Sequence, residues 1–302
     1  MKLMNLHLLQ LSRVVFVAIM IALGTSPVFA DDKLDIVASF SILGDMVKQV
    51  AGDQANVTTI VGPDADAHIY QPSVEDARRV ADADVIFVNG LGFETWSESL
   101  INESNSQAEV FVATKDVTPV LVDGETDPHA WNSLQNGVLY VQNIANALSV
   151  VSPDHKATFT TNAAAYITRL ETLDTDAKTR LAELPEHRRT VVTAHDAFGY
   201  LADAYDLNFL APVGIDTDVE PSAQALAKLI DQLRADNAAA LFVENITSPV
   251  LVQQISDETG IQLGGRLFSD ALSELGGPAT SYEAMFQHNL NTLLTALGSA
   301  SN

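Results

Sequence analysis

Three histidines of this chain, each in a short segment with the composition of a turn, could bind a metal ion together with one aspartate. The segments are DAHIYQP around His68, DPHAW around His129 and TAHDAFGY around His195, and the aspartate is Asp270. The chain contains no cysteine, so imidazoles and carboxylates are the strong ligands that it can offer a transition metal. This restriction makes the histidines the first candidates for a functional site.

The elements that must position these residues follow from β-branched runs that alternate with helical stretches. The runs of the first half are 34–39, 56–61, 84–89 and 109–114, and those of the second half are 190–195, 208–214, 239–245 and 264–270. Runs that are apolar on both faces and separated by helices indicate parallel strands in an α/β sheet. We therefore expect an α/β protein with two Rossmann-like lobes, each with a parallel sheet.

Three of the four candidate ligands lie at the carboxyl ends of expected strands. His68 follows the run 56–61, His195 ends the run 190–195, and Asp270 ends the run 264–270. Open α/β sheets bind ligands outside the carboxyl ends of their strands, so the coincidence favours a site over solvated loop residues. The segment around His129 also suits a purely structural turn, because proline fixes its backbone and tryptophan supplies bulk.

Other polar residues near these positions stay outside the expected ligand set. Asp196 directly follows His195 and suits the N-cap of a helix. Glu244 ends the run 239–245 and is either a partner behind a ligand or simply solvated. Three further histidines are expected to be solvated. His155 lies at a helix start, His187 in the polar EHRR turn, and His288 off the apolar stripe of the last helix.

A long amphipathic stretch separates the two lobes. Apolar residues recur at spacings of three and four from Tyr166 to Leu184, and Pro153 and Pro185 suit the first turn and the end of one helix. The expected organisation is an N-terminal lobe at 31–152, a linking helix at 153–185 and a C-terminal lobe at 186–302. A rigid rod in this place would make large lobe closure difficult.

The first thirty residues have the pattern of a cleavable secretory signal peptide, 1–30. Two basic residues precede an apolar run at 14–24 that is short for a membrane span, and Val28 and Ala30 suit signal peptidase. We expect cleavage after Ala30. Because no cysteine can accept a lipid there, a soluble protein of the bacterial periplasm is favoured.

The charge balance excludes one class of partner. Removal of the two basic signal residues takes the formal charge from −23 to −25, and so acidic a chain is not expected to bind nucleic acid. An acidic surface concentrates cations without selecting one. Its main expected effect is solubility.

These motifs together resemble those of the substrate-binding proteins of bacterial zinc, manganese and iron ABC importers, the metal-specific group of periplasmic binding proteins. The resemblance covers almost all of the chain after the signal and rests on DAHIYQPS, DPHAW, HDAFGY and FSDALSELGGPATSY, in this order and spacing. It implies two α/β lobes joined by a long backbone helix, with one metal ion between them. It also implies the first-lobe ligands His68 and His129 and the second-lobe ligands His195 and Asp270.

The resemblance also bears on the choice of metal. In that family the third ligand is usually histidine in zinc-type members and glutamate in many manganese or iron members, and here it is His195. Three imidazoles and one carboxylate suit four-coordinate zinc, whereas manganese prefers more oxygen ligands. We expect Zn²⁺, with Mn²⁺ or Fe²⁺ as the alternative. The long His- and Asp-rich loop of many zinc-type relatives is not present.

The expected function is capture of the ion and its delivery to a membrane permease, with no bond made or broken and therefore no enzyme activity. The expected partners are the metal ion and the cognate ABC permease, a periplasmic metallochaperone is a further candidate, and the expected state is a monomer. A zinc hydrolase is a rival, because three imidazoles and a water also form catalytic zinc sites. No HExxH helix supports it, and a fourth protein ligand would close the site. A surface adhesin lacks a visible anchor.

Overall fold

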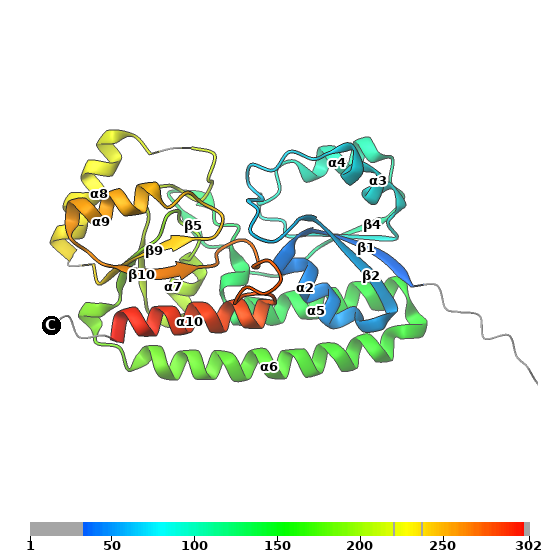
Figure 1. The fold of residues 1–302 in the computed structure, drawn as a ribbon. Helices are drawn as coiled ribbons and strands as arrows, with labels where there is room; N and C mark the ends of the chain where they lie inside the picture. Colours follow the sequence, from blue (N-terminus) through cyan, green and yellow to red (C-terminus); the bar gives the residue numbers. More distant parts are fainter. Residues whose placement is uncertain (1–32, 220, 237, 299–302) are drawn as a thin grey trace, which may run out of the picture. The chain divides into compact units, whose positions relative to one another are not determined.

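The computed structural model of the chain describes residues 33–219, 221–236 and 238–298, and the expected signal peptide at 1–30 lies outside them. In the described part, two four-stranded sheets form two α/β lobes (Figure 1). Every strand pair within these two sheets is parallel. The predicted fold class is confirmed.

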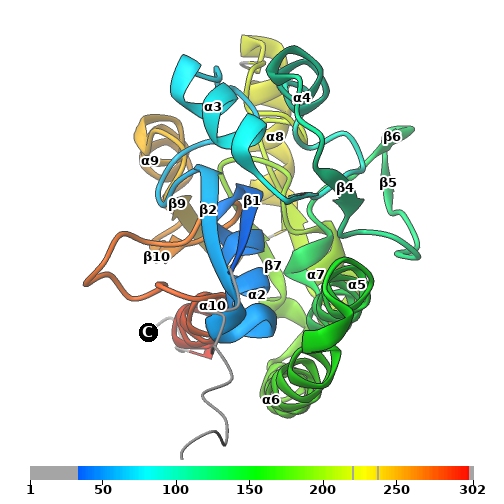
Figure 2. The ribbon, with the colours of Figure 1, turned by 90° about the vertical axis from the view of Figure 1, so that its right-hand side faces the viewer.

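The first lobe is built on a sheet with the strand order β2-β1-β3-β4. Its strands are β1 (Leu34–Phe40), β2 (Ala55–Val61), β3 (Val85–Val88) and β4 (Glu109–Val112). Its helices are α2 (Ser41–Ala51), α3 (Val74–Asp82), α4 (Ser97–Ser104) and α5 (Leu134–Val151). Helices α2 and α5 lie on one side of the sheet and α3 and α4 on the other (Figure 2), which explains why all four residues of β3 are buried and apolar.

The second lobe repeats this strand order when its strands are counted along the chain. The sheet order is β10-β9-β7-β8, with β7 (Thr190–Val192), β8 (Asn208–Leu210), β9 (Ala240–Glu244) and β10 (Leu263–Leu267). Its helices are α7 (Gly199–Tyr205), α8 (Ala223–Asp236), α9 (Val250–Thr259) and α10 (Tyr282–Gly298). The loops at the carboxyl ends of the two sheets are therefore equivalent places in the two lobes.

The predicted linking helix is present as α6 (Lys156–Ala182), which runs beneath both lobes (Figure 1). Its 27 residues span about 40 Å at the usual helical rise. Short 3-10 turns precede and follow it at Pro153–His155 and Glu186–Arg188. The helix packs against α2 and α5 of the first lobe and against α7 and α10 of the second, so it fastens the lobes as well as connecting them.

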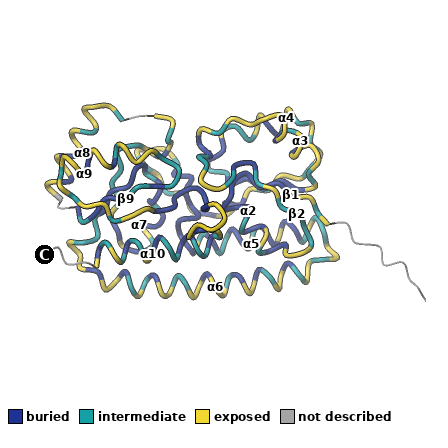
Figure 3. The backbone as a smooth tube through the Cα atoms, viewed as in Figure 1, coloured by how far each residue is buried: buried dark blue, intermediate teal, exposed yellow. Residues whose placement is uncertain are grey.

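One hydrophobic core extends through both lobes, from Ile36 in β1 to Leu297 in α10. Figure 3 shows that the buried backbone follows the sheets and the helices beneath them. A smaller, separate cluster under α8 and α9 includes Leu233, Leu241 and Val252. No helix in the described ranges is long and apolar enough to cross a membrane.

Candidate metal centre

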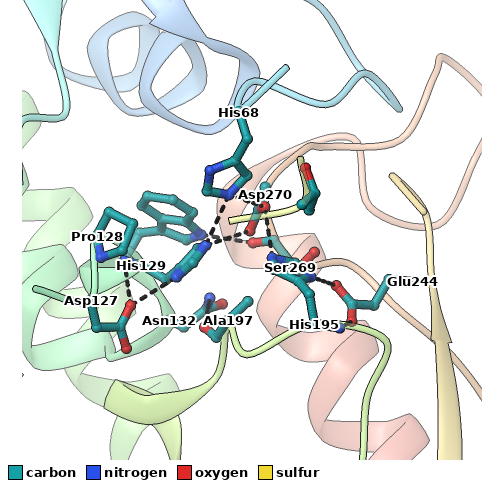
Figure 4. A network of polar contacts seen from close by, with 12 residues as sticks. His68, Asp127, Pro128, His129, Asn132, His195, Ala197, Glu244, Ser269 and Asp270 are labelled. Carbon is teal, nitrogen blue, oxygen red and sulfur yellow. Dashed lines mark hydrogen bonds and ion pairs between the residues drawn. The ribbon is translucent and has the colours of Figure 1, made fainter. Parts of the chain in front are cut away.

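The four predicted ligands come together where the two lobes meet, each on a loop at the end of a strand or turn (Figure 4). His68 lies between β2 and α3, His195 follows β7, and Asp270 follows β10. His129 directly precedes a 3-10 turn at Ala130–Asn132. All four are buried, and His68 is the most exposed at 9%.

The two first-lobe histidines share one local motif, Asp-x-His. Oδ1 of Asp66 accepts the backbone N–H of His68 at 2.9 Å, and Oδ1 of Asp127 accepts that of His129 at 2.9 Å. An aspartate that bonds the backbone two residues ahead fixes a tight turn. The sequence therefore sets the backbone direction of both imidazoles within three residues.

In the second lobe, Glu244 at the end of β9 fixes the backbone that carries His195. Its Oε1 accepts the backbone N–H groups of Ala194 at 2.7 Å and of His195 at 2.9 Å. Next to Asp270, the carbonyl of Ser269 accepts the indole N–H of Trp131 from the first lobe at 2.8 Å. This bond ties the loop that carries Asp270 to the turn that carries His129.

The inner nitrogens, Nε2, of the three imidazoles converge on the carboxylate of Asp270. Its Oδ2 lies 3.2 Å from Nε2 of both His68 and His195, and its Oδ1 lies 3.7 Å from Nε2 of His129. The Nε2 atoms of His68 and His129 are 3.2 Å apart. Tetrahedral zinc with bonds of about 2.0–2.1 Å needs ligand atoms about 3.3 Å apart. The cluster has the size that a single small cation requires.

Several of these inner atoms lack hydrogen bonds although they lie close together. Within the described residues, Nε2 of His195 and both oxygens of Asp270 have no hydrogen-bond partner, because their short separations lack hydrogen-bond geometry. Buried polar atoms are rarely left unsatisfied, since this is costly. A cation between them would satisfy all of them.

Each imidazole has a carboxylate at its outer nitrogen, Nδ1. The Nδ1 to oxygen distances are 2.8 Å from His129 to Asp127, 2.6 Å from His195 to Glu244 and 3.1 Å from His68 to Asp216. A carboxylate in this position keeps a proton on Nδ1 and leaves the lone pair of Nε2 for a metal. This arrangement favours, at each ring, the tautomer that metal binding needs.

The electrostatics of the centre favour a proton where no cation is bound. Burial disfavours the charged imidazole, but Glu244 and Asp270 outweigh this and raise the pKa of His195 well above its usual value. At His68 burial is likewise outweighed, by Asp270, and the pKa is raised. Burial also opposes the ionised form of Asp270, yet His195 and His129 hold its pKa well below its usual range.

Sequence reasoning missed two of the three outer carboxylates and left the third undecided. The sequence leaves open whether Glu244 is a partner behind a ligand or a solvated residue, and in the structure its side chain is fully enclosed behind His195. Asp127 repeats the Asp-x-His spacing of Asp66, so this repeat could have revealed it. Asp216 lies in a loop of the opposite lobe from His68, and no spacing along the chain points to it.

Outside the ligand set, one expectation was wrong and two held only in part. Asp196 is not a helix N-cap, because α7 begins at Gly199 with Phe198 in the cap position. His155 and His288 are half-buried instead of solvated, since Nδ1 of His155 lies 2.9 Å from Ser152 Oγ and Nε2 of His288 lies 3.0 Å from the carbonyl of Arg266. His187 is exposed as expected.

Fold and site together define a class of protein. In the described part of the chain, two parallel-sheet lobes fixed on one long helix enclose a buried cluster of three imidazoles and a carboxylate, which together offer four protein ligand atoms. A fully protein-enclosed cluster is suited to holding an ion, whereas catalytic zinc keeps a position for water or substrate. The class is that of the metal-binding proteins that enclose their ion between two lobes.

Comparison with known proteins gives the family. Residues 36–296 match the family described as zinc-uptake complex component A, periplasmic. The iron ABC transporter substrate-binding lipoprotein MtsA of Streptococcus pyogenes serotype M1 is 34% identical over 277 residues, which are 88% of this chain and 89% of the relative. The manganese ABC transporter substrate-binding lipoprotein scaA of Streptococcus gordonii is 32% identical over 279 residues, which are 89% and 90% of the two chains.

Among solved structures, the periplasmic zinc binding protein TroA from Treponema pallidum is similar with a TM-score of 0.84 at 29% identity, covering 88% of this chain and 99% of that one. The chain belongs to the zinc-uptake complex component A family, and it is a metal-binding substrate-binding protein of an ABC transporter that acts outside the cytoplasm. The members of this family named here are solute-binding proteins and not enzymes. The family predicted from the motifs is confirmed.

Proposed function

We propose that the protein binds Zn²⁺ between its lobes and delivers it to the membrane permease of an ABC importer. The ligands would be Nε2 of His68, His129 and His195 and a carboxylate oxygen of Asp270. The observation that carries the proposal is the convergence of these buried atoms within 4.8 Å of one another, with a carboxylate behind every imidazole.

The donor set supports zinc. Three imidazole nitrogens and one carboxylate oxygen give the four-coordinate arrangement that zinc adopts, and imidazole suits zinc better than it suits manganese. The separations of 3.2–3.7 Å between Asp270 and each imidazole and between His68 and His129 are close to those of a tetrahedral site. TroA, which has the same fold, is described as a zinc binding protein.

Manganese or iron is the second candidate, and one feature of Asp270 favours it. Its two oxygens both face imidazoles, Oδ2 at 3.2 Å from His68 and His195 and Oδ1 at 3.7 Å from His129. Binding through both oxygens would raise the coordination number to five, which suits the larger demand of manganese for oxygen. The relatives scaA and MtsA are named for manganese and iron.

We infer further that residues 1–30 are removed by cleavage after Ala30 and that the remaining chain acts as a soluble periplasmic monomer. The basic and apolar pattern of the first thirty residues supports cleavage. The relatives scaA and MtsA are lipoproteins, but this chain has no cysteine that could carry a lipid.

The proposal is tested by metal content and by competition. Protein purified without added metal is analysed for bound elements, and then titrated with zinc and with manganese against a chelator of known affinity. We expect one zinc ion per chain and tighter binding of zinc than of manganese. Tight manganese binding with weak zinc binding would overturn the choice of zinc, and failure to bind either ion would overturn the proposed function.

The ligand set is tested by Asp270→Ala, with Glu274→Ala as the matched control. Glu274 is an exposed carboxylate on the same loop. Loss of a partner behind a ligand costs about 10–100-fold in affinity, so loss of the ligand itself should cost more than about 100-fold. The control should bind as the wild type does. Unchanged affinity in Asp270→Ala would remove Asp270 from the ligand set.

A further inference from the structure

His68 differs from the other two histidines in how its outer nitrogen is held. Asp127 and Glu244 face the imidazole of a histidine in their own lobe, and their side chains are 0% exposed. Asp216 faces Nδ1 of His68 from the opposite lobe, on the loop after β8, and its side chain is 51% exposed. The imidazole of His68 is therefore held by a contact that crosses between the lobes and reaches solvent.

The two Asp-x-His motifs show what this contact replaces. At His129, Oδ1 of Asp127 accepts the backbone N–H and also lies 2.8 Å from the ring Nδ1. At His68, one oxygen of Asp66 accepts the backbone N–H, and the ring Nδ1 pairs with Asp216 instead. The other oxygen of Asp66 accepts the hydroxyl of Thr217 at 2.6 Å. Asp127 alone thus contacts both the backbone and the ring of His129, whereas at His68 the ring contact and the partner of Asp66 come from the second lobe, through Asp216 and Thr217.

We propose that Asp216 and Thr217 form a cross-lobe clasp with His68 and Asp66, in which Asp216 is a positioning residue for His68 and opening of the clasp releases the metal ion. The inference rests on the proposed function, because release has a meaning only if His68 is a ligand. The clasp makes His68 the ligand that leaves first.

The remaining contacts between the lobes favour opening at the clasp. Deeper in the interface, Trp131 donates to the carbonyl of Ser269, Asn132 to that of Ala197, and Tyr200 to that of Asp127, all buried (Figure 4 labels Asn132 and Ala197). Separating them would leave buried groups unpaired, which is costly. The side chain of Asp216 already reaches water, and exposed charge pairs contribute little.

The loop that carries His68 has further contacts of the exposed kind. Asp64 accepts the side-chain amide of Asn245 at 2.9 Å and the backbone N–H of Glu274 at 3.2 Å, both at the exposed rim. Helix α6 packs on both lobes on the opposite side. The backbone N–H of Asp64 also donates to the carbonyl of Leu272 at 2.8 Å. Movement of the loop at 62–68 away from the second lobe would break these bonds of Asp64 and leave the three buried bonds of Trp131, Asn132 and Tyr200 in place.

The release rate tests the clasp. Metal-loaded protein is mixed with excess chelator, with Zn²⁺ in one series and Mn²⁺ in another. Thr217→Val removes the hydroxyl without touching an imidazole, and Asp216→Asn removes the charge behind His68 while keeping its shape. We expect both to raise the dissociation rate constant about 10-fold or more. Thr217→Ser, which keeps the hydroxyl, and Asp218→Asn, a charge change on the same loop, should stay within about twofold of the wild type.

Nitrogen NMR of the histidine rings separates positioning from general disturbance. In the zinc-loaded protein, Asp216→Asn should shift the ring resonances of His68 and leave those of His129 and His195 in place, whereas Thr217→Val should leave all three tautomers unchanged. Wild-type release rates in both variants would overturn the proposal, as would equal shifts at all three rings.

Failure of the proposed function would look different. If the wild type bound neither ion, the clasp would be judged in the metal-free protein by hydrogen exchange of residues 62–68 and 213–219. Both variants must accelerate exchange there for the clasp to stand, and unchanged exchange would overturn it.

Discussion

The carboxylates behind the imidazoles decide which atom of each histidine carries a proton. Asp127, Glu244 and Asp216 each face an Nδ1 atom, so Nε2 is the atom left for the metal. At His195 the same arrangement has a second effect, because Glu244 and Asp270 also raise the pKa of the ring. Protons and metal ions therefore compete for the same lone pair.

We expect metal uptake at pH 7 to release protons. The pKa of His195 lies well above its usual value and that of His68 is raised, so we expect Nε2 of His195 to carry a proton in the metal-free protein that it must lose to bind a metal. The apparent affinity should thus fall with decreasing pH already above about 6.5, the unperturbed histidine value. Calorimetry in two buffers of different ionisation enthalpy measures the protons released. No release at pH 7, or an affinity that is constant from pH 8 to 5, would contradict this.

At the scale of elements, the strands of the two four-stranded sheets were predictable, whereas one helix and the short hairpin of β5 (Leu121–Val122) and β6 (Glu125–Thr126) were not. The eight runs of the sequence all became strands of the two sheets, because strands covered on both faces are recognisable by their apolar composition. Helix α5 was not predicted. It contains Gly137, which weakens local helix preference but is explained by packing, because a Cβ atom there would lie 2.5 Å from the hydroxyl of Tyr282.

The site was predictable only where it depends on local sequence. His68, His195 and Asp270 could be grouped because each follows a strand, and the carboxyl ends of parallel strands meet at one edge. The run 190–195 ends as a strand at Val192, and His195 itself forms an isolated bridge with Val213. Asp216 could not be found in this way, since its contact with His68 depends on how two lobes meet.

The helices α8 and α9 should be the first part of the second lobe to open. Their buried residues belong to the small cluster with Leu233, Leu241 and Val252, whereas α6 and α10 belong to the core that both lobes share. Segments with few buried apolar contacts open locally at lower free energy. Native-state hydrogen exchange with mass spectrometry should show faster exchange in α8 and α9 than in α6 and α10. Exchange of all four helices only through global unfolding would contradict the prediction.

At the scale of the whole molecule, the lobes are joined too firmly for wide closure. One core passes through both, and α6 packs on helices from each. The amphipathic stretch predicted the helix of this connection, and its rigidity stays a prediction. Capture and release of the ion must then involve loops at the rim more than rotation of one lobe against the other.

Metal binding should raise the melting temperature, and more so at higher pH. Binding to the folded form alone adds about 2.7 kcal/mol at a hundredfold excess over the dissociation constant. In the metal-free protein, the raised pKa of His195 gives a stabilisation that is complete below about 6.5 and is lost as the pH rises through the raised value. The stabilisation from the lowered pKa of Asp270 is instead lost only in acid, below its usual value of 3.8.

From pH 6 to 8 the metal-free protein should therefore lose stability while metal binds more tightly, so the difference in melting temperature widens. Calorimetric scans at pH 6, 7 and 8, with and without zinc, measure this difference. A difference that narrows with rising pH would contradict the assignment of the histidines as ligands.

The order of the ligands along the chain has a consequence for synthesis. His68 and His129 belong to the first lobe, while Asp270 follows β10, the last strand, and only α10 comes after it among the described elements. Proteins are made from the N-terminus, and N-terminal domains fold first. A chain that stops before residue 270 thus holds at most the three imidazoles, without the carboxylate on which they converge. We therefore expect the full ligand set to form only after β10 and Asp270 have been made, and a copy cut short before residue 270 to bind metal more weakly than the wild type.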